Sequence, residues 1–161
     1  MDVKNDRQRG KVVSTKVCVI GHFGFGKEML NGQTIKTKIV TAELEKQLGT
    51  EQIVKVDTHG GMKVLPRVMI QTFKAFCQCE DIVIFPAHNG LRIFVPICTG
   101  FNCFFHRKLH YVVIGGWLPK FIQSRKKLAE QLRAFDGIYV ETSTMKKALE
   151  SDGFHNILIM P

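Results

Sequence analysis

The feature that most constrains the fold is an alternation of short apolar runs with longer segments of helical period. The runs are rich in β-branched residues and lie at 16–23, 53–57, 81–85, 110–114, 137–140 and 156–160. Most are apolar at successive positions, a pattern typical of strands that are buried on both faces of a parallel sheet. The alternation therefore predicts an α/β fold, a Rossmann-like doubly wound and mainly parallel sheet of about six or seven strands flanked by helices.

The segments between the runs carry helical signals. In the first, five apolar residues share one stripe, which we expect to face the core: Ile35, Ile39, Val40, Leu44 and Leu48. A second stripe comprises Leu118, Phe121, Ile122, Leu128, Leu132 and Phe135. Prolines favour the first helical position, where a missing N–H costs nothing. Three helix starts are predicted on this ground, at Pro66, Pro96 and Pro119. Gly49 and Gly153 stand where C-terminal caps are expected.

The 161 residues suffice for one domain, which we place at 16–161 after a polar arm at 1–15. The longest apolar stretch, 91–105, is too short and too interrupted to span a bilayer, so it is expected to be buried or interfacial. Five cysteines, without a recognisable signal peptide before them, predict reduced thiols and a cytoplasmic location. The cysteine and histidine spacings do not match those of zinc sites, so no metal is expected.

The net charge of +9 predicts an anionic partner. Phe101, Phe104 and Phe105 stand beside the basic segment 106–108, and a second basic cluster lies at 125–127. Aromatic residues next to cations indicate peripheral contact with an anionic membrane, at the inner face of the cell membrane. A solvated cationic face is an equal alternative. Nucleic acid is not an expected partner, because no known motif or stacking platform accompanies the basic clusters.

A glycine-rich turn follows the first predicted strand. Gly21, Gly26 and Lys27 fit the spacing of a phosphate-binding loop, but Glu28 occupies the position that requires Ser or Thr for magnesium. We therefore expect a ligand-facing loop without triphosphate chemistry, with a plain turn as the alternative. The next helix begins with polar residues, and its N-terminus would favour hydroxyl or phosphate groups. An equal alternative is that Thr34 serves only as an N-cap.

Several segments together resemble the N-terminal domain of GT-B glycosyltransferases of family-4 type, in particular bacterial enzymes of capsular and other cell-surface polysaccharide assembly. These segments are the glycine turn with NGQTIKT, then DIVIFPAHNG, HYVVIGGWLP and FDGIYVETSTMKKALESDGFHNILIMP. The resemblance covers residues 16–161, and HYVVIGGWLP and GIYVETSTMKKAL are its more specific parts.

The resemblance implies one half of a two-domain enzyme. In that family the first domain binds the sugar acceptor, and the second binds the nucleotide-sugar donor. This chain would then bind a sugar or a lipid-linked acceptor, use the nucleotide-sugar as co-substrate without a cofactor, and be inactive alone. A donor-binding domain would come from a longer protein or from a partner chain. The alternative is a stand-alone Rossmann-like module that binds a phosphorylated or nucleotide ligand.

Acceptor-site residues are expected after the carboxyl ends of the strands, where ligands bind in open α/β sheets. His88 is the candidate for acid–base or hydrogen-bonding chemistry, and a loop histidine without a role is the alternative. Trp117 is expected either to stack on a sugar ring or to anchor the core. The resemblance places these residues in the acceptor cleft: Gly24, Phe25, Gly26, Lys27, Asn31, Gln33, Lys36, Thr58, His59, Asn89, Gly116, Trp117, Glu141 and Thr142.

Overall fold

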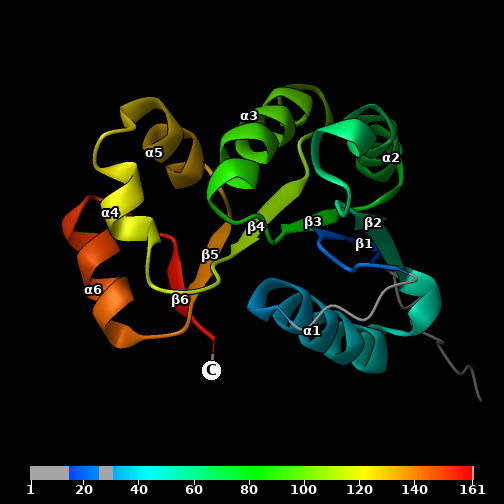
Figure 1. The fold of residues 1–161 in the computed structure, drawn as a ribbon, viewed down its shortest axis with the longest axis horizontal. Coiled ribbons are helices and arrows are strands. Elements are labelled where there is room, and N and C mark those ends of the chain that lie inside the picture. The colour runs from blue at the N-terminus through cyan, green and yellow to red at the C-terminus, as the bar shows by residue number, and fades with distance from the viewer. Residues whose placement is uncertain (1–14, 26–30, 161) are drawn as a thin grey trace, which may run out of the picture.

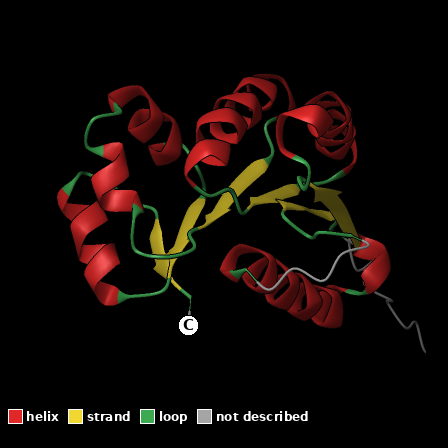
Figure 2. Cartoon of the chain, in the orientation of Figure 1, coloured by secondary structure: helices red, strands yellow, loops and turns green. Residues whose placement is uncertain are grey.

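A computed structural model describes residues 15–25 and 31–160 of the chain. Its described strands, shown in Figure 2, are β1 (Val17–Gly21), β2 (Ile53–Asp57), β3 (Asp81–Ile84), β4 (Lys108–Val112), β5 (Gly137–Val140) and β6 (Ile157–Ile159). The α-helices are α1 (Gly32–Leu48), α2 (Leu65–Gln78), α3 (His88–Phe105), α4 (Leu118–Ile122), α5 (Lys126–Arg133) and α6 (Ser143–Ser151). Two 3₁₀ turns, Thr50–Gln52 and Gly61–Val64, flank β2.

The strands form one parallel sheet in the order β2-β1-β3-β4-β5-β6. The predicted α/β, Rossmann-like fold is therefore confirmed. The strand order changes direction at β1, because β2 lies on one side of it and β3 on the other. At such a switch point the loops leaving β1 and β3 diverge and leave a crevice at the carboxyl edge of the sheet.

The two faces of the sheet are covered unequally. Figure 1 shows α2, α3 and α5 on one side of the sheet and α1 on the other. The main core joins the sheet to α2–α6, with Phe76, Tyr111 and Phe154 among its fully buried members. In a second, smaller core, α1 is the only contributor among the described helices, through Val40 and Leu44.

The α1 side of the sheet is left partly open beyond β3. An apolar hollow of about 310 Å³ lies there, and we call it the open half-face. It is lined by Val17, Val40, Leu44, Asp81, Val83, His110, Val112, Tyr139 and Met160. Two hydrogen bonds cross it, from His110 Nε2 to Asp81 Oδ1 (2.8 Å) and between Tyr139 Oη and His110 Nδ1 (3.3 Å). His110 is thus held in a polar chain on the sheet.

The prediction for the buried face of α1 is confirmed for Val40 and Leu44, which pack against the second core, and was wrong for the other three residues. Ile35, Ile39 and Leu48 are 42%, 62% and 42% exposed, whereas the buried residues of the helix are Thr34, Thr37 and Thr41. The reason is a close approach of α1 to β1. A Cβ on Gly21 would lie 2.6 Å from Thr37 Cγ2, so the helix sits too near the strand for larger side chains.

Two of the three helix starts predicted from proline agree with the structure. Pro66 and Pro119 lie in the first turns of α2 and α4, as predicted. Pro96 instead lies inside α3, which begins eight residues earlier at His88, so that prediction was wrong. Tertiary packing holds the helix through the proline, because Leu91, Val95 and Cys98 on its inner face are fully buried.

The remaining helical expectations hold in part. Residues 118–135 contain two helices, α4 and α5, and all members of the predicted stripe are buried except the half-buried Phe121. Gly49 caps α1 with φ of 95°. The five cysteines are free thiols. None of the described helices has the length and apolarity needed to cross a bilayer.

Candidate functional site

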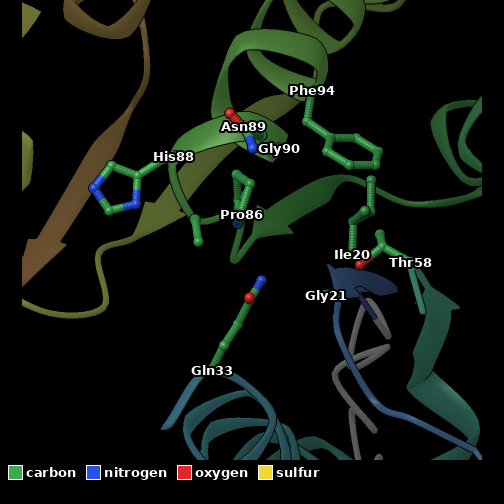
Figure 3. A pocket seen from close by; sticks show the side chains of 10 residues that line it. Ile20, Gly21, Gln33, Thr58, Pro86, His88, Asn89, Gly90 and Phe94 are labelled. Carbon is green, nitrogen blue, oxygen red and sulfur yellow. The ribbon is translucent and has the colours of Figure 1, made fainter. Parts of the chain in front are cut away.

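A pocket of about 290 Å³ opens at the switch point between β1 and β3. Its lining residues come from the end of β1, the first turn of α1, the loops after β2 and β3, and the start of α3. They are Ile20, Gly21, Gln33, Thr58, Pro86, Ala87, His88, Asn89, Gly90 and Phe94. In Figure 3, Gln33 points from α1 towards Pro86, and Ile20, Thr58 and Phe94 lie on the side away from His88. The site thus combines an apolar wall with amide, hydroxyl and imidazole groups.

The wall of the pocket is held by hydrogen bonds to the segment that follows β3. Gln33 Nε2 donates to the Phe85 carbonyl at 3.0 Å, and the buried Tyr111 hydroxyl donates to the Pro86 carbonyl at 3.2 Å. Burial raises the pKa of Tyr111, so its hydroxyl stays protonated and remains a donor. One N–H of the Gln33 amide is thus engaged, which leaves its carbonyl oxygen and its second N–H to meet a ligand hydroxyl.

His88 stands at the rim as the first residue of α3. Its ring stacks on Trp117 with centroids 3.9 Å apart, and its side chain projects away from Phe94 and Thr58. Trp117 in turn donates from Nε1 to the Ile114 carbonyl at 2.7 Å and packs against the main core. One face of Trp117 is therefore covered by His88, which favours the anchoring role for this residue over direct sugar stacking.

Asp57 organises the described part of the glycine turn. Its carboxylate accepts from the backbone N–H groups of Phe23 (2.9 Å), Gly24 (3.3 Å), Phe25 (3.1 Å) and His59 (3.0 Å). Burial by itself would raise the pKa of Asp57, but these four donors together lower it below its usual value. The N–H groups that we expected to face a phosphate or sugar are thus engaged by an internal carboxylate.

Two histidines form a chain beside this turn. His22 Nδ1 lies 2.7 Å from Thr34 Oγ1, and His22 Nε2 lies 3.0 Å from His59 Nδ1. Burial, and then the charge of His59, lower the pKa of His22, partly offset by the charge of Asp57. A neutral His22 matches this arrangement, because one ring nitrogen then donates and the other accepts. The chain can relay a hydrogen bond from α1 to the loop after β2.

Other predicted residues serve the scaffold. Asn31, rather than Thr34, is the N-cap of α1, and its side chain accepts from Thr34 N at 2.8 Å. Thr142 caps α6 in the same way, accepting from Met145 N at 3.2 Å. Lys36 and Glu141 form an ion pair of 2.7 Å that links α1 to the loop after β5.

The predicted residues therefore fall into separate groups. Gln33, Thr58, His88 and Asn89 come together in the pocket. Phe25 and His59 face a neighbouring hollow of about 390 Å³ beside β2, which also includes Asp57, Lys55 and Arg67. Gly116 is exposed and lines neither space. Gly26 and Lys27 lie outside the described residues.

Sequence reasoning missed His22 and Asp57 as members of the site. Both stand at the carboxyl end of a predicted strand, so the rule that selected Thr58 and His59 could have selected them. What the rule did not reveal is that Asp57 would turn inward to the glycine turn. Among the described residues, no group of three or more His, Cys, Asp or Glu side chains is placed to hold a metal ion.

The chemistry available at the pocket is that of hydrogen bonding. The Gln33 carbonyl and the Asn89 amide can pair with hydroxyl groups, and the exposed imidazole of His88 can donate or accept a hydrogen bond. Apolar Ile20, Pro86 and Phe94 offer contact to the carbon face of a ring.

Comparisons of the chain with protein-family models, curated proteins and solved structures gave no match.

Proposed function

We propose that this domain is the acceptor-binding half of a two-domain glycosyltransferase of GT-B type that acts in cell-surface polysaccharide assembly. The observation that carries the proposal is the pocket at the switch point, where Gln33, Thr58, His88 and Asn89 converge. A sugar presents hydroxyl groups around an apolar ring, and this lining offers partners for both. The family resemblance of residues 16–161 supports the same assignment.

The electrostatics of the glycine turn, beside the pocket, disfavour a phosphate at the turn. Asp57 already occupies the N–H groups of Phe23, Gly24 and Phe25, and its own charge would repel a phosphate placed beside them. A sugar hydroxyl carries no such penalty. In this proposal, His88 hydrogen-bonds the acceptor hydroxyl that receives the sugar, and a donor-binding domain from a longer protein or a partner chain brings the nucleotide-sugar.

Binding of methyl glycosides of common hexoses, followed by NMR chemical-shift changes, tests the proposal. We expect shifts at the pocket and an affinity reduced about two- to tenfold in His88→Ala and in Gln33→Ala, the range for one lost hydrogen bond. His155→Ala, at an exposed histidine near β6, and Gln78→Ala, at the exposed end of α2, are matched controls and should bind as the wild type does. Circular dichroism verifies folding of each variant.

Uridine diphosphate provides the competing test in the same experiment. Tight binding of this nucleotide by the isolated domain, without any response to glycosides, would replace the proposal with a nucleotide-binding module. Glycoside binding that is insensitive to both pocket variants would also remove its support.

A further inference from the structure

A groove lined by basic residues lies between α3 and α5, beside the pocket but separate from it. Its volume is about 570 Å³. We call it the basic groove, and it is lined by Arg92, Pro96, Ser124, Arg125, Lys126, Lys127, Leu128 and Gln131. Four of these residues are cationic and none is acidic. Within the described part of the chain, none of the four cations forms an ion pair.

The cations of the basic groove are arranged at a cost to the fold. Lys126 and Lys127 begin α5, whose first turn carries no acidic residue. A helix N-terminus bears partial positive charge, so lysines there are less favourable than aspartate or glutamate. Arg92 adds a further charge from α3. An anion in the groove would relieve the mutual repulsion of these groups.

Arg125 is fixed in position before any ligand binds. Its guanidinium stacks 4.0 Å above the Phe121 ring, and its Nη1 donates to the Phe121 carbonyl (2.8 Å) and to Ser124 Oγ (3.1 Å). The Nε and Nη2 groups have no hydrogen-bond partner among the residues described. A planar guanidinium held in this way keeps donors free for an oxyanion and loses little side-chain entropy on binding.

A row of stacked rings joins the basic groove to the pocket. His88 lies at the pocket rim and stacks on Trp117, and Trp117 meets Phe121 edge-on with centroids 5.1 Å apart. Phe121 then carries Arg125. A single extended ligand could therefore lie with a sugar in the pocket and an anionic group in the groove, passing along this row of exposed and half-buried rings.

We propose that the basic groove binds the phosphate or diphosphate group of the acceptor, and so selects phosphate-linked sugars. The inference rests on the proposed function for the identity of the acceptor as a sugar. The part that does not depend on the proposed function is the assignment of phosphate oxygens to Arg92, Arg125, Lys126 and Lys127. It also explains how the domain can avoid phosphate at the glycine turn and still use its positive charge for binding.

Titration of the domain with inorganic pyrophosphate, measured by calorimetry and NMR, tests the assignment. We expect binding to the wild type, with shifts at residues 124–128, and an affinity at least about tenfold lower in Lys126→Gln/Lys127→Gln. Lys146→Gln/Lys147→Gln removes the same charge from an identical pair on α6 and should change the affinity less than about twofold. Equal weakening by both double variants, or no binding to the wild type, overturns the proposal.

Two further measurements distinguish phosphate binding in the groove from membrane contact and from the proposed function. Vesicles of phosphatidylcholine with and without phosphatidylglycerol test for a membrane source of the phosphate. Groove-dependent binding to the anionic vesicles without binding of pyrophosphate would make the groove a membrane contact and overturn the assignment. His88→Ala should lower glycoside affinity and leave pyrophosphate affinity unchanged. A wild type that binds pyrophosphate in the groove but binds no glycoside would count against the proposed function alone.

Discussion

At the scale of single residues, Asp57 has the largest influence on the candidate site. One carboxylate accepts four backbone N–H groups, three from the turn after β1 and one from the loop after β2. Hydrogen bonds to an ionised acceptor are stronger than neutral ones, so the two loops are tied together through one charge. Neutralising that charge should loosen both loops at once.

Replacing Asp57 by asparagine should lower the free energy of unfolding at pH 7 by about 1–3 kcal/mol, because the amide accepts fewer and weaker hydrogen bonds. The wild type should also lose stability in acid. Since folding lowers the pKa of Asp57, its contribution is complete above the usual value of about 4 and disappears as the pH falls through the folded-state pKa. Urea denaturation between pH 7 and pH 2.5 measures both effects.

The expected signature of Asp57→Asn is a smaller difference in stability between neutral and acid pH. Asp152→Asn serves as control, because the Asp152 side chain has no hydrogen bond within the described residues. If Asp57→Asn keeps the full pH dependence of the wild type, the carboxylate does not have the role assigned to it here.

At the scale of secondary-structure elements, α1 is distinguished by its threonine face. Thr34, Thr37 and Thr41 are buried, and their hydroxyl groups differ in hydrogen bonding. Thr41 Oγ1 donates to the Thr37 carbonyl at 2.6 Å, whereas Thr37 Oγ1 is buried without a partner among the described residues. The same side chain should therefore contribute differently at two successive turns of one helix.

Valine substitutions separate these two contributions. Valine keeps the shape of threonine and a similar helix propensity but removes the hydroxyl. Thr37→Val should leave stability unchanged or raise it by up to about 1 kcal/mol, because it removes a buried polar atom that makes no hydrogen bond. Thr41→Val should lower stability by about 0.5–1.5 kcal/mol, the usual net value of one hydrogen bond. Thermal denaturation monitored by circular dichroism measures both changes.

An exposed position on the same helix provides the control. Ile39→Gln, at a side chain that is 62% exposed, should change stability by less than about 0.5 kcal/mol. A loss of about 2 kcal/mol at Ile39 would instead support the apolar stripe predicted from the sequence and would contradict the packing of α1 described here.

Local sequence signals predicted the strands better than they predicted helix faces. The continuous apolar runs located all six described strands, because burial on both faces leaves little room for polar residues. The face of α1 depends on how near the helix comes to Gly21, which is a tertiary distance and leaves no periodic mark in the sequence. Likewise, Pro96 lies within α3 because neighbouring apolar residues hold the helix through it.

The candidate site was predictable as a location and less so as a set of contacts. The resemblance placed Gln33, Thr58, His88 and Asn89 in one cleft, and these four residues line the same pocket. The stacking of His88 on Trp117 depends on how two separate loops fold over the sheet. Contacts of this kind join residues far apart in the chain, so local propensities do not encode them.

At the scale of the whole molecule, the open half-face is the main departure from a closed doubly wound domain. Parallel sheets usually have both faces covered, yet on the α1 side α1 is the one described helix in the second core, and the apolar hollow beside β4 and β5 stays open. Leu158 is 47% exposed at the edge of the sheet, and it points to the same side as Met160, which packs at the second core. Exposed apolar surface of this kind promotes association.

The isolated domain should therefore self-associate at high concentration through the open half-face. Sedimentation equilibrium should show weaker association for Leu158→Lys than for the wild type, with unchanged secondary structure by circular dichroism. Ile70→Lys, at a residue of α2 that is 59% exposed, is the control for adding a charge at an apolar surface position. If both variants associate as the wild type does, the open half-face is not the surface involved.

The ion pair between Lys36 and Glu141 has a consequence for the order in which the protein matures. The described pocket lining ends at Phe94, yet Lys36, which follows Gln33 by three positions on α1, pairs with a carboxylate 105 positions further along the chain. During synthesis the amino-terminal strands can pair early, but the ion pair of Lys36 with Glu141 can form only after β5 has joined the sheet. The link between α1 and the carboxyl-terminal half of the sheet would thus be among the last contacts that the growing polypeptide forms.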